Sequence, residues 1–146
     1  DRKQVELVLE NRGQVEAEVD EMKMTLALSN LVENGIKYNK EGGSVRLKVD
    51  SDFADAIITI SDTGCGIAEE HFNKIYQRFY RVDKTRDRAT GGTGLGLAIV
   101  HQIITMHHGS ISIRSKEDVG TSFTVRIPLI AVQNAKNLAE KEEKDR

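Results

Sequence analysis

The sequence contains few of the residues that mark several protein classes. It has one cysteine, Cys65, one proline and no tryptophan in 146 residues. A single cysteine excludes a framework of internal disulfides and fits a reducing, cytosolic setting. No apolar run approaches the ~20 residues that a membrane-spanning helix needs. Because 21 basic residues nearly balance 23 acidic ones, the net charge of -2 gives no general affinity for nucleic acid or a membrane surface.

The remaining composition fits one soluble globular domain, with 38% hydrophobic and 30% charged residues. We expect the domain to occupy residues 1–130 and the charged residues 131–146 to form a disordered tail. The chain opens on the polar stretch "DRKQVELVLE" without an initiator methionine. We therefore expect it to be a piece excised from a longer protein.

Two hydrophobic periodicities alternate along the chain. Apolar and polar residues alternate over 5–9 and 15–19, which predicts a hairpin with its turn around Asn11. Asp20 is the expected N-cap of a helix that ends near Tyr38. Residues 82–93 carry no apolar stripe and predict a mobile loop. The other expected elements are a hairpin of 45–49 with 56–60, a short helix at 69–76, a helix at 95–107, and strands around 111–113 and 123–127. Together they predict a two-layer α/β sandwich, with helices on one face of a mixed, mainly antiparallel sheet.

The stretch "GGTGLGLAIV" places four glycines just before an aliphatic helix. A helix start exposes unpaired N–H groups, and Gly94 and Gly96 would let an anion approach them closely, with Thr93 as a hydroxyl donor. The alternative is a flexible connector. Neither the P-loop pattern nor the dinucleotide fingerprint occurs, so a phosphate site needs support from elsewhere in the chain.

Three further segments each allow a functional and a structural interpretation. In "NLVENGIKYN", Asn30, Asn34 and Lys37 share one helix face and suit a magnesium–phosphate group, or form a solvated face. In "DTGCG", Asp62 ends a strand and can accept a hydrogen bond from an amine such as that of adenine, or start a turn. In "IYQRFYRVD", aromatic and arginine side chains either anchor a loop base and reach phosphate or cover a helix end.

The order of these segments resembles the ATP-binding catalytic domain of bacterial sensor histidine kinases. The four motifs are N-x-x-x-N-x-x-K-Y, D-x-G-x-G-I, R-F-Y-R and G-x-G-L-G-L, spread over nearly the whole chain apart from its tail. These kinases belong to the ATPase superfamily of DNA gyrase, Hsp90 and MutL. The resemblance implies a Bergerat-type ATP-binding fold with a mobile ATP lid at 82–93, and binding of ATP with Mg²⁺.

The resemblance also implies a role for each matching residue. Asn34 would hold magnesium, Lys37 would contact phosphate, and Asp62 would read the adenine amine. Glu33 is the candidate base for the reaction, with Lys37 and Arg81 offsetting charge. The whole expected nucleotide set is Asn30, Asn34, Lys37, Tyr38, Asp62, Gly64, Gly66, Ile67, Ile75, Tyr80, Arg81, Thr93, Gly94, Leu95, Gly96, Leu97 and Phe123.

Three departures from the family pattern stand out. Tyr76 replaces a usual phenylalanine, and Gly35 replaces a commoner alanine inside a helix. No H-E-x-R-T-P-like segment is present, although His101 and His107 fall in the last predicted helix. We therefore expect the phosphoacceptor histidine on a dimerisation domain upstream of Asp1.

The implied function is two-component signal transduction by a protein-histidine kinase. Its γ-phosphoryl group would pass to the dimerisation domain and then to a response regulator. The domain would be the cytoplasmic part of a sensor that can be membrane-anchored, without itself contacting membrane or nucleic acid. The alternatives are an ATPase of the gyrase or Hsp90 type, a serine kinase of the anti-sigma-factor type, and a degenerate nucleotide-binding interaction module.

Overall fold

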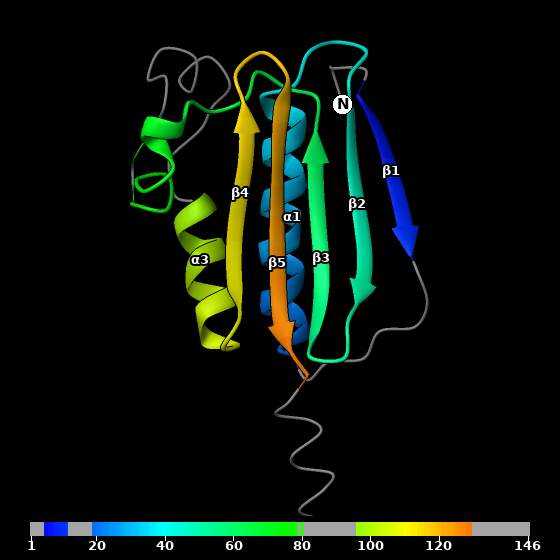
Figure 1. The fold of residues 1–146 in the computed structure, drawn as a ribbon, viewed down its shortest axis with the longest axis vertical. Helices are drawn as coiled ribbons and strands as arrows, with labels where there is room; N and C mark the ends of the chain where they lie inside the picture. The colour runs from blue at the N-terminus through cyan, green and yellow to red at the C-terminus, as the bar shows by residue number, and fades with distance from the viewer. Residues whose placement is uncertain (1–4, 12–18, 79, 81–95, 130–146) are drawn as a thin grey trace, which may run out of the picture.

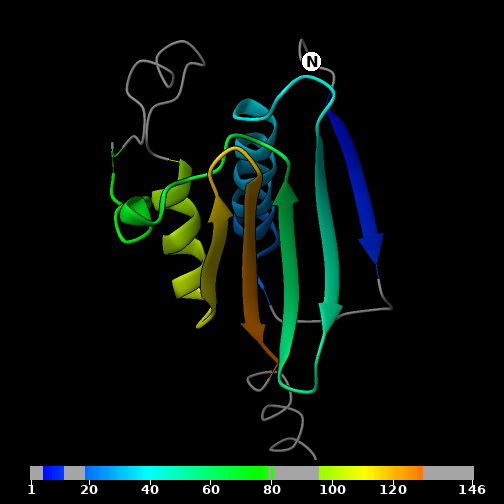
Figure 2. The same ribbon diagram turned by 45° about the horizontal axis from the view of Figure 1, so that its top comes forward.

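The computed structural model describes residues 5–11, 19–78, 80 and 96–129, and the structural statements below concern these residues. They form a five-stranded sheet with α-helices packed on one face (Figures 1 and 2). The elements are β1 (Glu6–Asn11), α1 (Glu21–Lys37), β2 (Ser44–Ser51), β3 (Asp55–Asp62), the 3-10 helix η1 (Glu69–His71), α3 (Gly96–Met106), β4 (Ser110–Lys116) and β5 (Gly120–Pro128). The predicted two-layer α/β sandwich is confirmed.

The strands lie in the order β1-β2-β3-β5-β4. β1 runs parallel to β2, and the other neighbours are antiparallel. The parallel pair follows from the chain order, because α1 separates the two strands and carries the chain back to the end where β1 began. Asn11, expected in a hairpin turn, is instead the last residue of β1, so that prediction is wrong. Of the expected partner run 15–19, only Val19 is described, and it lies outside any strand.

The core lies between the sheet and the helices. Alternate residues of β3 and β5 face α1 and α3, as the period-two pattern predicts. Leu31 of α1, Ile60 of β3 and Ile104 of α3 are each 1% exposed. Burying one such side chain contributes about 1.5–3 kcal/mol. The core therefore fixes the position of α1, whose polar face carries the candidate site.

The two helices are tied together at one end by a histidine. The Asp20 carboxylate caps α1 by accepting from the Lys23 N–H at 3.0 Å, as predicted. The Asp20 N–H in turn donates to Nε2 of His107 at 2.9 Å, while His107 Nδ1 donates to the Ile103 carbonyl at 2.8 Å. His107 was expected inside the last helix but follows its end by one residue. These bonds set the start of α1 beside the end of α3.

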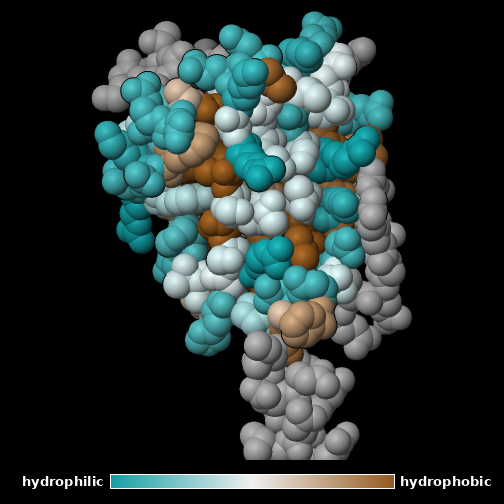
Figure 3. All heavy atoms as spheres, viewed as in Figure 1, coloured by the Kyte–Doolittle hydropathy of each residue, from teal (hydrophilic) through white to brown (hydrophobic). Residues whose placement is uncertain are grey.

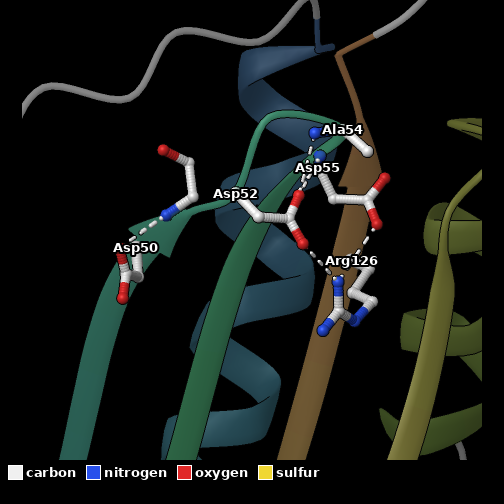
Figure 4. A network of polar contacts seen from close by, with 6 residues as sticks. Asp50, Asp52, Ala54, Asp55 and Arg126 are labelled. Atoms are coloured by element: carbon white, nitrogen blue, oxygen red, sulfur yellow. Dashed lines mark hydrogen bonds and ion pairs between the residues drawn. The ribbon is translucent and has the colours of Figure 1, made fainter.

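The β2–β3 turn is held by a polar cluster at the end of the sheet remote from Asp62 (Figure 4). Asp52 Oδ1 accepts from the N–H groups of Asp55 and Ala54 at 2.7 and 2.9 Å. Arg126 Nη1 donates to the carboxylates of Asp52 and Asp55 at 3.1 and 3.2 Å. The two backbone N–H groups, followed by Arg126, lower the pKa of Asp52. This cluster closes the hairpin far from the candidate site.

The face of the sheet that turns away from α1 and α3 is polar. Thr59 and Ser61 of β3 and Ser122 and Thr124 of β5 alternate with the core residues, and the Ser61 and Ser122 hydroxyls lie 2.9 Å apart. Figure 3 shows this face as mostly teal and pale, with smaller brown areas. The buried residues of β3 and β5 thus face α1 and α3 on the other side of the sheet.

The segment after η1 is less helical than predicted. A helix was expected over 69–76, but only Glu69–His71 forms a 3-10 helix, and turns follow. Its bonds mostly span three residues, as from the Phe72 N–H to the Glu69 carbonyl at 3.1 Å. Ala68, the N-cap residue, makes no side-chain bond to the helix start. This short segment lacks a side-chain cap and packs against the core through Ile75, which is 4% exposed, and through partly buried Tyr76.

Tyr76 offers a test of this packing. Its hydroxyl is buried without a hydrogen-bond partner among the described residues, and burial raises its pKa to about 12. Tyr76→Phe is expected to raise the free energy of unfolding by about 1 kcal/mol, measured by urea denaturation, because it removes an unsatisfied hydroxyl. Tyr80→Phe is the matched control and is expected to destabilise, because the Tyr80 hydroxyl bonds to His71 Nδ1. A loss of stability in Tyr76→Phe would contradict this account.

Candidate nucleotide-binding site

The two carboxylate oxygens of Asp62, the last residue of β3, differ in their hydrogen bonds. Oδ1 accepts from the Gly64 N–H at 2.8 Å and from the Thr121 N–H at 3.2 Å. Oδ2 has no hydrogen-bond partner in the described part of the chain. Burial raises the pKa of Asp62, and the bonds from Gly64 and Thr121 oppose that rise. The side chain is thus oriented by the backbone, with one oxygen left for a ligand.

The loop after β3 is fastened to the end of α1. The Cys65 N–H donates to the carbonyl of Tyr38, the C-cap residue of α1, at 3.1 Å. A Cβ on Gly64 would lie 2.6 Å from that same carbonyl oxygen, so only glycine allows the approach. The expected adenine-side residues Tyr38, Asp62 and Gly64 are therefore brought together.

The β4–β5 turn supports the other side of this loop. The Asp118 N–H donates to the Cys65 carbonyl at 2.7 Å, and the Ile67 N–H donates to Ser115 Oγ at 2.7 Å. Gly66 has φ +73°, and a Cβ there would lie 2.2 Å from the Lys116 carbonyl oxygen. Gly64 and Gly66 thus make a tight turn directly after Asp62.

Sequence reasoning missed two residues of this support. Thr121 is 6% exposed, orients Asp62 through its N–H, and shares a hydrogen bond with the Ser115 hydroxyl, with 2.7 Å between the oxygens. Thr121 belongs to the stretch "GTSF", from which only Phe123 was selected as a site residue. That stretch was the available signal for Thr121. Ser115 has no comparable signal, because a serine in a strand suggests no particular partner.

The start of α3 lies against the polar face of α1. A Cβ on Gly96, the first residue of α3, would lie 4.0 Å from Cγ of Asn30. The first turn of α3 holds no acidic residue, so its unpaired N–H groups keep their attraction for an anion. Lys37 Nζ lies 5.9 Å from the centre of the Tyr38 ring. The glycine-rich and asparagine-rich motifs therefore meet in space.

Other expected site residues lie elsewhere or outside the described residues. Ile75 and Phe123 are both 4% exposed in the core, against which Ile67 and Leu97 are partly packed. Tyr80 contacts His71. Arg81, Thr93, Gly94 and Leu95 are not described, nor are the loop at 82–93 and the tail at 131–146.

Glu33, the candidate base, is exposed and lines a shallow groove between α1 and β2 together with Leu28 and Leu47. Asn30, by contrast, turns toward α3. Glu33 follows Asn30 by three residues on α1, so the two side chains neighbour each other along the helix, with Glu33 nearer β2 and Asn30 nearer α3. The position of Glu33 relative to an acceptor histidine therefore stays a prediction.

The donor groups present fit a magnesium–phosphate group better than a metal held by protein alone. No group of three or more histidine, cysteine, aspartate or glutamate residues suited to a metal occurs in the described ranges. Half-buried Asn34 supplies a neutral carboxamide oxygen, which suits a hard cation that draws its other ligands from phosphate and water. Within the same ranges, no helix is long and apolar enough to cross a bilayer.

A family model for histidine kinase-, DNA gyrase B- and HSP90-like ATPases matches residues 19–131. The chain belongs to this ATPase family. It is 43% identical to sensor histidine kinase RppB of Synechocystis sp. over 120 residues, which are 82% of this chain and 26% of RppB. Its structure resembles the catalytic domain of histidine kinase ThkA, with a TM-score of 0.74, 28% identity and coverage of 86% and 81% of the two chains.

These relatives place the chain on the sensor histidine kinase branch of the ATPase family, as a catalytic domain with the Bergerat fold. A third relative is full-length ShkA in complex with AMPPNP, with a TM-score of 0.72 and 25% identity over 85% of this chain and 25% of ShkA. The chain spans about a quarter of the length of RppB and ShkA. It therefore matches one domain of longer kinases.

Proposed function

We propose that this ATPase-family domain binds Mg-ATP between α1, the loop after β3 and the start of α3. The observation that carries the proposal is Asp62, whose Oδ1 is fixed by two backbone N–H groups while Oδ2 stays available for a donor. The exocyclic amine of adenine is such a donor. The AMPPNP complex of the similar ShkA supports a nucleotide ligand.

The other motifs would hold the phosphate end. Asn30 lies beside Gly96, whose N–H group at the start of α3 would attract phosphate, and Lys37 adds a positive charge seven residues later on the same face of α1. Thr93, Gly94 and Arg81 are expected to complete this end. Magnesium, held by Asn34, would neutralise phosphate charge when bound.

In the longer protein, we propose transfer of the γ-phosphoryl group to a histidine of a separate dimerisation domain. The bond from the γ-phosphorus to its bridging oxygen breaks, a bond to the neutral imidazole nitrogen forms, and ADP leaves. The second ring proton passes to a base, for which Glu33 is the candidate. Lys37 and Arg81 offset the charge, since such transfers depend mainly on positioning and electrostatics.

We further propose that a response regulator receives the phosphoryl group and that the domain works on the cytoplasmic side of a sensor. Because the acceptor lies on another domain, the isolated chain should bind ATP but hydrolyse it slowly. Steady hydrolysis by the isolated domain would instead favour water as the acceptor.

Lys37→Ala tests the phosphate end of the site by calorimetric titration. ATP binding is expected to weaken about tenfold, because a charge-assisted contact is lost, while adenosine binding stays unchanged. Lys40→Ala, an exposed lysine in the turn after α1, is the control and should bind ATP as the wild type does. If Lys37→Ala and Asp62→Ala both keep wild-type ATP affinity, the assigned site is wrong.

A further inference from the structure

The end of α1 and the end of β3 are joined by a largely buried polar cluster to which the nucleotide motifs assign no role. Its members are Asn39, Gly43, Ser44 and Thr63. Asn39 directly follows Tyr38, and Thr63 directly follows Asp62. The cluster therefore contains the residue that directly follows, in the sequence, each of the two residues proposed to contact the adenine.

The hydrogen bonds of this cluster link Asn39, Ser44 and Thr63, and Asn39 Oδ1 also accepts from the Lys40 N–H at 2.9 Å. Asn39, 5% exposed, donates from Nδ2 to the Ser44 carbonyl at 2.9 Å and accepts at Oδ1 from the Thr63 hydroxyl at 3.0 Å. Thr63 Oγ1 accepts in return from the Ser44 N–H at 2.9 Å. The Thr63 N–H donates to the Ser44 carbonyl at 3.2 Å. The Asn39 and Thr63 side chains thus bond both to each other and to the backbone of Ser44.

The packing leaves little room for rearrangement. A Cβ on buried Gly43 would lie 2.2 Å from Asn39 Oδ1 and 2.6 Å from Thr63 Oγ1. The Gly43 carbonyl also accepts from the Glu6 N–H at 2.9 Å, which anchors the cluster to β1. A buried polar set in which every member is satisfied holds its groups in one arrangement.

We propose that Asn39 and Thr63 are positioning residues for purine recognition, because they fix the separation of Tyr38 from Asp62. This inference rests on the proposed nucleotide site. The Thr63 hydroxyl sets where β3 ends relative to α1, and so where Asp62 Oδ2 stands. Loosening the contact between Asn39 and Thr63 moves Asp62, the side chain proposed to recognise the base. It leaves the phosphate contacts at the start of α3 in place.

Thr63→Val tests the proposal, because valine keeps the β-branched shape and removes the hydroxyl. Calorimetry measures the binding of ATP, which carries an amine at purine position 6, and of ITP, which carries a carbonyl there. We expect ATP binding to weaken about tenfold and ITP binding to change less than about twofold. Thr63→Ser keeps the hydroxyl and should restore the wild-type ratio of the two affinities.

A purely structural role would lower stability without changing this ratio in the folded protein, and an unchanged ratio in folded Thr63→Val overturns the inference. Asn39→Ser, which shortens the other partner, is measured in the same way and decides the question if Thr63→Val does not fold. If the wild type binds ATP while both variants keep its selectivity, only the positioning role fails. If the wild type binds no ATP, the proposed function fails, and the inference with it.

Discussion

Asp62→Asn is expected to weaken ATP binding by about 100-fold although it changes one atom. The reason is the backbone around Oδ1. The Gly64 and Thr121 N–H groups need an acceptor, so they hold the asparagine carbonyl oxygen where Oδ1 stood. The amide NH₂ then replaces Oδ2 and presents a donor to the donor amine of adenine. A carboxylate hydrogen bond is lost, and two donors face each other.

The same substitution should not lower stability. Burial raises the pKa of Asp62 above 3.8, so the folded state binds the proton more tightly than the unfolded state does. The stability linked to this group is therefore fully present below the unfolded pKa and is lost as pH rises through the folded pKa. Asparagine carries no charge, so at pH 7 the free energy of unfolding of Asp62→Asn should equal or exceed that of the wild type.

Three measurements make this prediction specific. ITP carries a carbonyl at position 6, so Asp62→Asn should bind ITP better than ATP. Asp55→Asn, at the other end of β3 and paired with Arg126, should leave ATP affinity unchanged. In the wild type, ATP binding should weaken as pH falls through the raised pKa of Asp62. Equal ATP binding by Asp62→Asn and wild type would show that this carboxylate does not read the base.

Gly66→Ala is expected to lower the free energy of unfolding by about 3 kcal/mol. Two costs add at this position. The residue has φ +73°, which L-residues rarely adopt, and the added Cβ would lie 2.2 Å from the Lys116 carbonyl oxygen. A backbone atom cannot move aside as a flexible side chain can. The β4–β5 turn would shift and carry the Thr121 N–H away from Asp62, so ATP affinity should fall as well.

Gly42→Ala separates the two costs of Gly66→Ala. Gly42 has φ +80°, but a Cβ there meets nothing within 4 Å. Only backbone strain remains, so the expected loss is about 1 kcal/mol, with ATP affinity unchanged. Both variants are measured by urea denaturation. Equal losses would mean that the contact with Lys116 is not important for stability.

Local sequence patterns predicted most of the fold. The period-two runs gave β2, β3 and β5, and the helical spacing that follows Asp20 gave α1 to within a residue. These signals are reliable because one face of each element is buried. Pairing across the sheet is not local: the parallel partner of β1 depends on the path of α1, which the run around Asn11 does not reveal.

Residues of the candidate site could be predicted from the sequence where they form part of a recognisable motif. Asp62, Gly64, Asn30 and Gly96 could be selected because each belongs to a spaced pattern. Their supports were not selected, since Thr63 bonds to Asn39 across 24 residues. Such bonds come from the folded chain, and a single serine or threonine has too many possible partners for sequence to decide among them.

The central claim is that one site gathers the end of α1, the loop after β3 and the start of α3 around Mg-ATP. Amide NMR during titration with Mg-AMPPNP tests this most directly. The account predicts large shifts for the Gly64, Gly96 and Thr121 amides and none for Ala54, in the β2–β3 turn at the far end of the sheet. Shifts centred on Ala54, or none at saturating nucleotide, would contradict it.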